Sequence, residues 1–483
     1  MTAVCIAYRM GWLLVMLAAF MILPVLQSVV EVTAVAALPF LRGAFVTLFV
    51  GVGLIAAFRH ETPPRSGWAA VVFVTAAWII LPVFAALPIL DAVSGLSPLD
   101  AYFAAMAALT TTGAGGLAEE QLKTGGVLVW LAVLQWLGGA GALSVATGVF
   151  APILWAGVPL TAVPLPRTPT SLLDRLGTMT RLILPVYTML TAGVFLVLLI
   201  CGLPFPNAFC TALSAVATGG LSPTATGFAG FGSPFVPGVV SLAGILGASS
   251  ILIHWYWMHR RIGPVLADAE LRFFIAVLAV ASLIAMGLAL AAPPVEGQTP
   301  SPWQAAFLAV SLVTTSGWTF DGTAFTHGLP VPLILALPAM GAMALSTAGG
   351  IKLIRVVLLF KQANRELERL AHPHGVARVK LAGMRIDEGV SNRIGALFMA
   401  LILTAGALTL AVSAHGVPFM EAISASLSVL SNTGPAFQLA TGGQTGYADL
   451  PAGAKVLLCV GMVLGRVEVL ALLSLLNPAY WRR

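Results

Sequence analysis

The stretch that decides the fold is PLDAYFAAMAALTTTG, residues 98–113, and related stretches occur three more times in the chain. The other copies run from Pro206 to Gly219, from Pro302 to Gly317 and from Pro418 to Gly434, so that 13 to 16 positions separate each proline from its glycine. Proline suits the first turn of a helix, and glycine permits the positive φ with which a backbone leaves one. Each copy therefore predicts a short helix that ends in an irregular strand.

The length of these copies indicates where they lie. Crossing a bilayer takes about 20 helical residues, so a single copy is too short to span, and each lies between two longer apolar segments. A short helix with a polar loop at membrane depth is tolerated only where it lines a cavity. The pattern predicts four re-entrant pore loops, and four copies in one chain are what a pore around a pseudo-fourfold axis needs.

Composition places the chain in a membrane. Its 483 residues are 59% hydrophobic and 9% charged, with a mean hydropathy of +0.98, whereas soluble proteins carry about 25% charged residues. We therefore predict an all-α polytopic membrane protein, and we do not interpret the net charge of +6 as a nucleic-acid signal. The four cysteines lie apart in apolar sequence without metal-binding spacing, so we expect no transition metal, no disulfide and no enzyme site.

The chain divides into an N-terminal helix pair, residues 1–66, and four tandem repeats at 67–166, 167–262, 263–392 and 393–483. The pair comprises about Met10–Val30 and Arg42–Phe58, lacks the pore motif and is interpreted as accessory. The predicted spanning helices of the repeats are Trp68–Leu90, Val127–Leu154, Leu182–Leu203, Val239–Trp257, Phe273–Ala292, Val331–Phe360, Ile394–Ala414 and Ala454–Leu476. Ten residues before the glycine of each copy stand Phe103, Phe209, Phe307 and, in the fourth, Ser424.

The placement of Lys and Arg predicts the topology. With the N-terminus inside, most basic residues fall in loops predicted to be cytoplasmic, including seven between Lys361 and Arg393. All four pore loops then open at the outer face, where acidic residues such as Asp100 and Glu421 collect. These carboxylates either raise the cation concentration at the mouth of a pore or are ordinary solvated loop residues, and the sequence leaves both readings open.

The pore loops carry oxygen-bearing residues next to their glycines. A dehydrated cation needs oxygens in place of water, as rings of backbone carbonyls supply in potassium channels. No acidic residue lies in the four strands, which favours a monovalent cation over calcium or magnesium, ions that prefer carboxylates. A single Thr-Gly would indicate ordinary helix packing, but four at matching places predict a selectivity filter that consists of Thr111-Thr112-Gly113, Ala217-Thr218-Gly219, Thr315-Ser316-Gly317 and Asn432-Thr433-Gly434.

Two further stretches bear on how a pore is controlled. Val331–Phe360 is too long for one straight span, and its middle, Gly341–Gly350, is small and partly polar. This middle is either a gating loop that uses Gly341, Ser346, Thr347, Gly349, Gly350 and Lys352, or a kinked helix whose cations snorkel to the cytoplasmic interface. In the final helix, Arg466 either faces the pore as a barrier to cations or pairs with Glu468 or another acid.

These residues resemble the potassium-translocating subunit of the Trk/Ktr/HKT superfamily, and the TrkH type most closely, over nearly the whole chain. The most specific motifs are Ser346–Lys352 with Arg355, Gln135–Gly139, Thr218–Gly220, Asn432–Pro435, His372-Pro373 and Gly465–Glu468. The resemblance implies a homodimer with one pore per subunit, potassium as the transported ion, a gating loop at 341–350 and an inner-pore arginine at Arg466. It further implies the bacterial inner membrane, both termini in the cytoplasm and no cofactor in this chain. A TrkA-like cytosolic partner that binds NAD(H) or ATP/ADP would dock at Lys361–Arg393.

Three functions remain to be compared. The first is channel-like potassium uptake, driven by the membrane potential. The second is an ion-coupled symporter that uses H⁺ or Na⁺, because re-entrant loops and broken helices occur in such transporters, usually in two repeats. The third is the conducting subunit of an ATP-driven pump, in which ATP would act through another chain because this one has no P-loop. Four matching loops favour the first.

Overall fold

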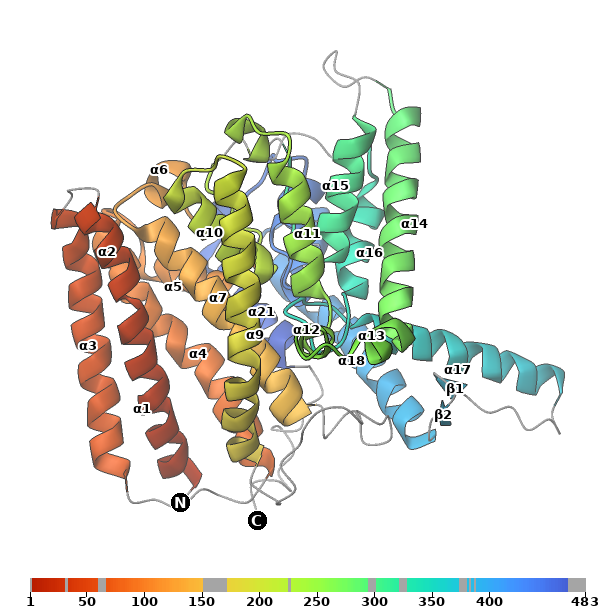
Figure 1. Ribbon diagram of the computed structural model, residues 1–483, viewed down its shortest axis with the longest axis horizontal. Helices are drawn as coiled ribbons and strands as arrows, with labels where there is room; N and C mark the ends of the chain where they lie inside the picture. Colours follow the sequence, from red (N-terminus) through yellow and green to blue (C-terminus); the bar gives the residue numbers. More distant parts are fainter. Residues whose placement is uncertain are drawn as a thin grey trace.

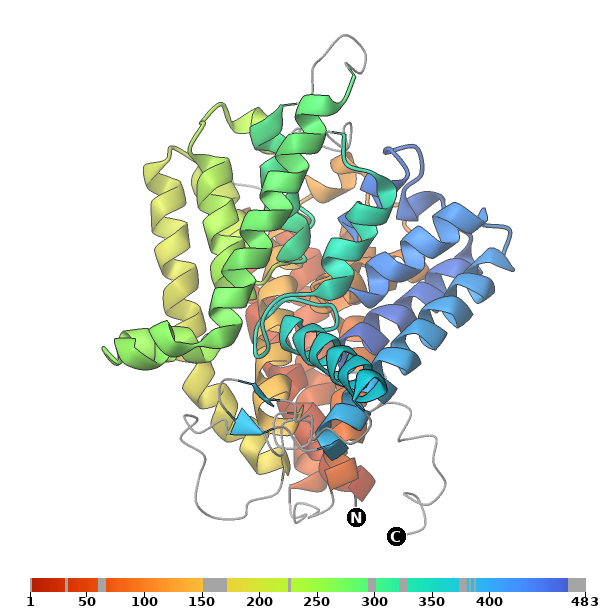
Figure 2. The same cartoon turned by 90° about the vertical axis from the view of Figure 1, so that its right-hand side faces the viewer.

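A computed structural model describes residues 2–30, 34–59, 67–150, 172–224, 227–293, 301–320, 328–372, 380–381, 384–385 and 388–467. In these ranges the protein is a bundle of helices (Figures 1 and 2), with one short antiparallel strand pair, β1 (Lys380–Leu381) and β2 (Met384–Arg385). Seven of the described helices are long and apolar enough to cross a membrane, and a bent pair adds an eighth candidate. The chain is a multi-pass, all-helical membrane protein, as the composition predicts.

The N-terminal helices form a pair at one side of the bundle (Figure 1). Helices α1 (Thr2–Phe20) and α2 (Ile22–Val30) run on from one another, and α3 (Ala34–Phe58) packs against α1. Gly11 and Gly51 face each other, and a Cβ at either would meet the backbone oxygen of the other. Phe40 of α3 lies edge-on to Trp130 with ring centroids 6.4 Å apart. The pair therefore packs against the first repeat.

Each repeat has a spanning helix, a short pore helix and a second long segment. The first spanning helices are α4 (Gly67–Ala92), α9 (Leu172–Ile200), α14 (Ala269–Ala291) and α18 (Glu388–Ser413). The pore helices are α5 (Pro98–Leu109), α10 (Phe205–Val216), α15 (Pro302–Val313) and α19 (Phe419–Leu430). The second segments are α7 (Val127–Val145) with a π-helical turn at Ala146–Phe150, α11 (Val236–Ala248) with α12 (Ile251–Met258), α16 (Val331–Met340) with α17 (Leu353–Ala371), and α21 (Ala452–Val467). Short helices α6 (Glu119–Leu122), α13 (Ile262–Ala267) and α20 (Pro435–Ala440) join them.

Two predicted spans are interrupted. Val239–Trp257 was expected to be one helix, but α11 and α12 meet at Ser249–Ser250 at an angle of 98°. Val331–Phe360 is broken in its small-residue middle, since α16 ends at Met340 and α17 begins at Leu353. A break in a helix frees backbone groups that need hydrogen-bond partners inside a membrane. Here backbone groups at one break hydrogen-bond to backbone groups at the other. Met343 N–H donates to Ala248 O (3.2 Å), and Ile251 N–H donates to Leu345 O (3.0 Å).

The pore helices lie in the buried centre, and the longer helices surround them. In α5, eight of twelve residues are buried, and five of those eight are alanines. By contrast α14 buries only five of its 23 residues, and large apolar side chains such as Leu283 and Leu290 face outward. Small residues let membrane helices approach closely, so the alanine-rich sequence places the pore helices inside. Residues 151–154 and 468–476, the predicted ends of two spans, lie outside the described part of the chain.

Candidate ion pore

The four pore helices have the same length and the same ending. Each has 12 residues, and the second residue after each helix has a positive φ: 51° at Thr111, 53° at Thr218, 58° at Thr315 and 51° at Asn432. The next residue donates its N–H to the carbonyl five residues earlier, at 2.8 to 2.9 Å. This is a Schellman ending, in which glycine is the usual left-handed residue. Non-glycine residues in such positions cost about 1–3 kcal/mol each and cluster at functional sites.

The shared ending fixes the register of the four strands. Their three positions are 111–113, 218–220, 315–317 and 432–434. In the second strand the counterpart of Gly113 is therefore Gly220, which has a φ of 71°. Gly219, which residue types alone indicate, lies one residue before this position, because Thr218-Gly219 has the same residue types as Thr112-Gly113.

The same shift moves two other residues of the second repeat. Ala217 is the C-cap of α10 and lies at the level of the other C-caps, Thr110, Thr314 and Ser431. The counterpart of Phe103 and Phe307 is Cys210, and Phe209 instead packs with Phe195 and Phe205. The prolines also occupy different places, at N1 of α5 and α15 but at the N-cap of α19. The pore helices thus have the same length, although the prolines lie at different positions relative to the helix start.

The four strands meet in a closed ring in the order of the chain. A Cβ at Gly113 would collide with Gly219 O, and one at Gly220 would collide with Ser316 O. The third and fourth strands meet where Gly317 faces Pro435, within 2.9 Å of a Cβ position. The fourth strand returns to the first, because Gly434 N–H donates to Thr112 O at 2.6 Å and Asn432 Nδ2 donates to Thr112 Oγ1 at 3.0 Å. The ring therefore joins all four repeats.

A cavity of about 300 Å³ opens onto one side of this ring. Its lining includes Gly113, Gly220 and Gly317, the third-position glycines of three strands, and Pro435, which follows the fourth glycine. Polar side chains line its wall, namely Ser222, Thr224, Thr319, Gln438 and Lys123. The cavity is a vestibule that leads to the ring.

The ring is polar, buried and suited to a cation. Thr111, Thr112, Thr218, Thr315, Ser316, Asn432 and Thr433 are each at most 1% exposed. All four pore helices run toward the ring with their C-terminal ends, which carry partial negative charge. Within the described ranges, Thr111 Oγ1 and Asn432 Oδ1 are buried without a hydrogen-bond partner, and a buried acceptor without a partner is costly. Oxygens in such a site can replace the water of a dehydrated ion.

The interruption between α16 and α17 lies against the ring on the side away from the vestibule. Thr347 Oγ1 is 2.9 Å from Gly247 O and 3.1 Å from Val216 O, the last helical carbonyl of α10. Gly349 N–H donates to Thr315 Oγ1 at 2.9 Å, and a Cβ at Gly349 would collide with Ser431 O. Gly341 and Gly350 both have a φ of 72°, which suits glycine. The segment 341–350 thus contacts the ends of three pore helices.

Arg466 of α21 connects segment 341–350 to the C-terminal end of α5, the remaining pore helix. Its Nε donates to Thr110 O at 2.5 Å and its Nη1 donates to Thr347 O at 2.7 Å, while Nη2 has no partner among the residues that the structure describes. The predicted alternative partner, Glu468, lies outside the described residues. Arg466 therefore places a guanidinium at the C-terminal end of α5, between the first repeat and the interrupted helix.

The far side of segment 341–350 is held by charged groups. Glu270, in the first turn of α14, accepts the N–H of Ala344 at 2.7 Å. Lys352 Nζ donates to Ala348 O and lies 3.5 Å from Ser346 Oγ, and Ser346 Oγ donates to Met343 O at 2.6 Å. The segment is therefore a loop that is held in place by hydrogen bonds, and not a kinked helix.

Comparison with known proteins identifies the family of this chain. Residues 38–478 match the family model of TrkH, described as a cation transport protein. The chain belongs to the TrkH family.

The relatives of this TrkH-family chain match over nearly their whole length. It is 32% identical over 435 residues to the Trk system potassium uptake protein TrkH of Halomonas elongata, with 88% of each chain covered. It is 30% identical over 478 residues to the protein of the same name of Salmonella typhimurium, with 98% of each covered. Among solved structures, the potassium transporter TrkH from Vibrio parahaemolyticus matches with a TM-score of 0.85 and 28% identity over the full length of both chains.

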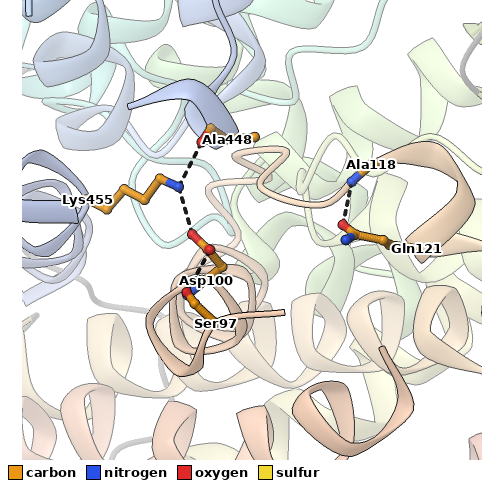
Figure 3. Close-up of polar contacts among 6 residues, drawn as sticks. All are labelled: Ser97, Asp100, Ala118, Gln121, Ala448 and Lys455. Carbon is orange, nitrogen blue, oxygen red and sulfur yellow. Dashed lines mark hydrogen bonds and ion pairs between the residues drawn. The ribbon is translucent and has the colours of Figure 1, made fainter. Parts of the chain in front are cut away.

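One ion pair of this TrkH-family protein joins its first and last repeats near the vestibule (Figure 3). Lys455 Nζ of α21 donates to Asp100 Oδ1 of α5 at 2.7 Å and to Ala448 O at 2.9 Å. Asp100 also bonds the N-cap residue, because Ser97 Oγ donates to its Oδ2 at 2.7 Å. Asp100 thus has a structural role at the junction of the first and last repeats, which the sequence did not predict, while its carboxylate stays partly exposed.

Sequence reasoning missed several residues that this TrkH-family site uses. Gln135 was noted only as part of a motif, yet its Nε2 donates to Gly219 O at 2.8 Å. Tyr187 of α9 is buried beside Gly139 and stacks on Trp136 with ring centroids 5.3 Å apart. Glu270 lies in none of the motifs found in the sequence. Gln135 and Tyr187 could have been singled out as polar residues inside apolar helices, but this pattern does not predict which groups they contact.

Proposed function

We propose that this protein carries K⁺ into a bacterial cell across the cytoplasmic membrane, channel-like, through the ring of four strands. The observation that supports this most is the closure of the ring, since contacts join strand one to two, two to three, three to four and four to one. The ring has buried oxygens and no carboxylate in residues 111–113, 218–220, 315–317 and 432–434. The named function of the relatives, potassium uptake, agrees with it.

In the proposed mechanism, K⁺ loses water in the vestibule and binds carbonyl and hydroxyl oxygens of the strands. The membrane potential drives it inward, with about 2.3 kcal/mol per 100 mV for one charge. Residues 341–350 act as a gating loop, because they lie under three strand ends and are bonded to Arg466. In the closed state Arg466 presents a positive charge on the path of the ion, which adds an electrostatic barrier.

Regulation is proposed to come from a TrkA-like cytosolic subunit that binds NAD(H) or ATP/ADP, with the transporter as a homodimer. Helix α17 supports such an input, because it begins at the end of the gating loop and projects from the bundle (Figure 1). Its outer part is exposed at Phe360, Leu367 and Leu370 and carries basic residues, among them Arg369. A partner that moves α17 would pull directly on Lys352 and the loop.

The ring assignment is tested by reversal potentials of the purified protein in bilayers under K⁺, Rb⁺ and Na⁺ gradients. Wild type should follow the K⁺ gradient. Gly113→Ser should lower the K⁺/Na⁺ permeability ratio about tenfold, equivalent to 1.4 kcal/mol, because its Cβ displaces Gly219 O. Gly232→Ser is the matched control, with the same φ of 65° but no atom within 4 Å of its Cβ. An equal effect of both variants, or flux that requires a H⁺ or Na⁺ gradient, contradicts the proposal.

A further inference from the structure

The fourfold pattern of the ring is broken in its second strand. In strands one and three, the C-cap hydroxyl and the hydroxyl at the second strand position lie within hydrogen-bond distance. Thr110 Oγ1 is 2.8 Å from Thr112 Oγ1, and Thr314 Oγ1 is 3.1 Å from Ser316 Oγ. Strand four has Ser431 and Thr433 at these places, and Thr433 Oγ1 donates to Ser431 O at 3.3 Å. Three strands are therefore braced by their own side chains.

The second strand has no such side chains. Its C-cap is Ala217 and its second position is Gly219. A glycine is not required there by the backbone, because Gly219 has no positive φ, unlike Gly220 next to it. The residue that stands at this place is instead Gln135 of α7. The three atoms nearest to a Cβ at Gly219 are Oε1, Cδ and Nε2 of Gln135.

Gln135 occupies this place at a cost. Its side chain is 1% exposed, its Nε2 donates to Gly219 O at 2.8 Å, and its Oε1 has no hydrogen-bond partner in the described part of the chain. Burying an acceptor without a partner is unfavourable, and a helix interior at this point would be more stable with an apolar side chain. Such a residue indicates a functional requirement rather than stability.

We propose that Gln135 is a positioning residue of the filter that determines its ion preference: its amide replaces the hydroxyl groups that the second strand lacks and fixes the direction of the Gly219 carbonyl. Gly219 O also lies against Gly113 of the first strand, so the amide sets the spacing between these two strands. Discrimination between alkali ions depends on the number and placement of carbonyl dipoles. This inference rests on the proposed function, because it concerns the selectivity of the same ring.

The test uses three variants of the full-length protein and the reversal-potential measurement. Gln135→Met keeps the length and volume of the side chain but removes the donor, and it should lower the K⁺/Na⁺ permeability ratio about tenfold while K⁺ conductance persists. Gly219→Ser should harm selectivity because its Cβ meets Gln135. Gln135→Ala combined with Gly219→Ser should recover the wild-type ratio to within about threefold, because a serine then stands where Ser316 stands in strand three.

Gln121→Met is the matched control. Gln121 also hydrogen-bonds the backbone, although as an acceptor: its Oε1 accepts the N–H of Ala118 at 2.9 Å (Figure 3). It lies outside the four ring strands, so loss of this bond should leave the ratio unchanged. A wild-type ratio in Gln135→Met, or a double variant no better than Gly219→Ser, overturns the inference. If Gln135→Met does not fold, the double variant decides alone, and its failure to fold or to select K⁺ also overturns the inference. Wild type without K⁺ preference instead contradicts the proposed function.

Discussion

At the scale of single residues, the closure of the ring brings Lys455 of the last repeat and Asp100 of the first repeat together as an ion pair. Lys455 is only 7% exposed, and its ammonium is paired with a residue 355 positions away. Burial by itself raises the pKa of Asp100, but the hydrogen bonds from Lys455 and Ser97 and the charge of Lys455 outweigh it, so that the pKa lies below its usual 3.8. The sequence predicts Asp100 on the outer side, but its pairing with Lys455 depends on the meeting of the first and last repeats and leaves no sequence pattern.

We expect Asp100→Asn to lower the free energy of unfolding by about 1–3 kcal/mol, because Lys455 loses its charged partner. Since the folded-state pKa of Asp100 is lowered, its contribution is complete above about pH 4 and is lost as pH falls through the folded pKa. Thermal unfolding in detergent, followed from pH 8 to pH 3, should show wild type and variant converging in acid. Glu421→Gln is the control, at the equivalent place in the first turn of α19. A constant difference across this pH range contradicts the assignment.

At the scale of elements, local sequence predicted one broken helix and not the other. The small, partly polar residues between Gly341 and Gly350 predicted that Val331–Phe360 is not one straight helix, with a loop and a kink both open, and the structure has a loop between α16 and α17. The bend at Ser249–Ser250 was missed, because Val239–Trp257 reads as one apolar run. The backbone groups freed at this bend find partners far away in the sequence, since the carbonyl oxygens of Gly247 and Ala248 accept hydrogen bonds from the loop of the third repeat. Tertiary bonds of this kind leave no local pattern.

Removal of residues 342–348 should raise basal K⁺ flux about tenfold or more, if the loop holds the pore mostly closed. The deletion removes the Thr347 contacts with Arg466 and with the end of α10. Glu270→Ala should raise flux less, because it leaves the Thr347 contacts in place and removes the hydrogen bond to Ala344, whereas Glu366→Gln on the exposed part of α17 should leave it unchanged. Flux of ⁸⁶Rb⁺ into liposomes measures all three. A deletion variant that folds and conducts at the wild-type rate would make the loop a passive break.

At the scale of the whole molecule, the sequence predicted an all-helical protein with four pore loops, because composition and a fourfold motif do not depend on exact register. It did not predict the register of the second strand. That register follows from the positive φ of Thr218 and a helix that begins at Phe205, whereas residue types alone favoured Thr-Gly at 218–219. The positive φ values therefore show which positions of the repeats are equivalent better than the glycines do. With that register, the second strand lacks the side-chain hydroxyls of the other strands at the place where Gln135 lies.

Because the ring takes one strand from every repeat, an ion bound there should stabilise the whole chain and not one repeat. A ligand at 100 times its dissociation constant contributes about 2.7 kcal/mol to the free energy of unfolding. We expect the thermal unfolding temperature in detergent to rise by several degrees when KCl or RbCl replaces choline chloride at constant ionic strength, and to rise less with NaCl. Gly113→Ser should lose this dependence and Gly232→Ser should keep it. Equal stabilisation by all four salts would mean that the four strands meet without forming an ion site, since packing alone gives no reason to distinguish potassium from sodium.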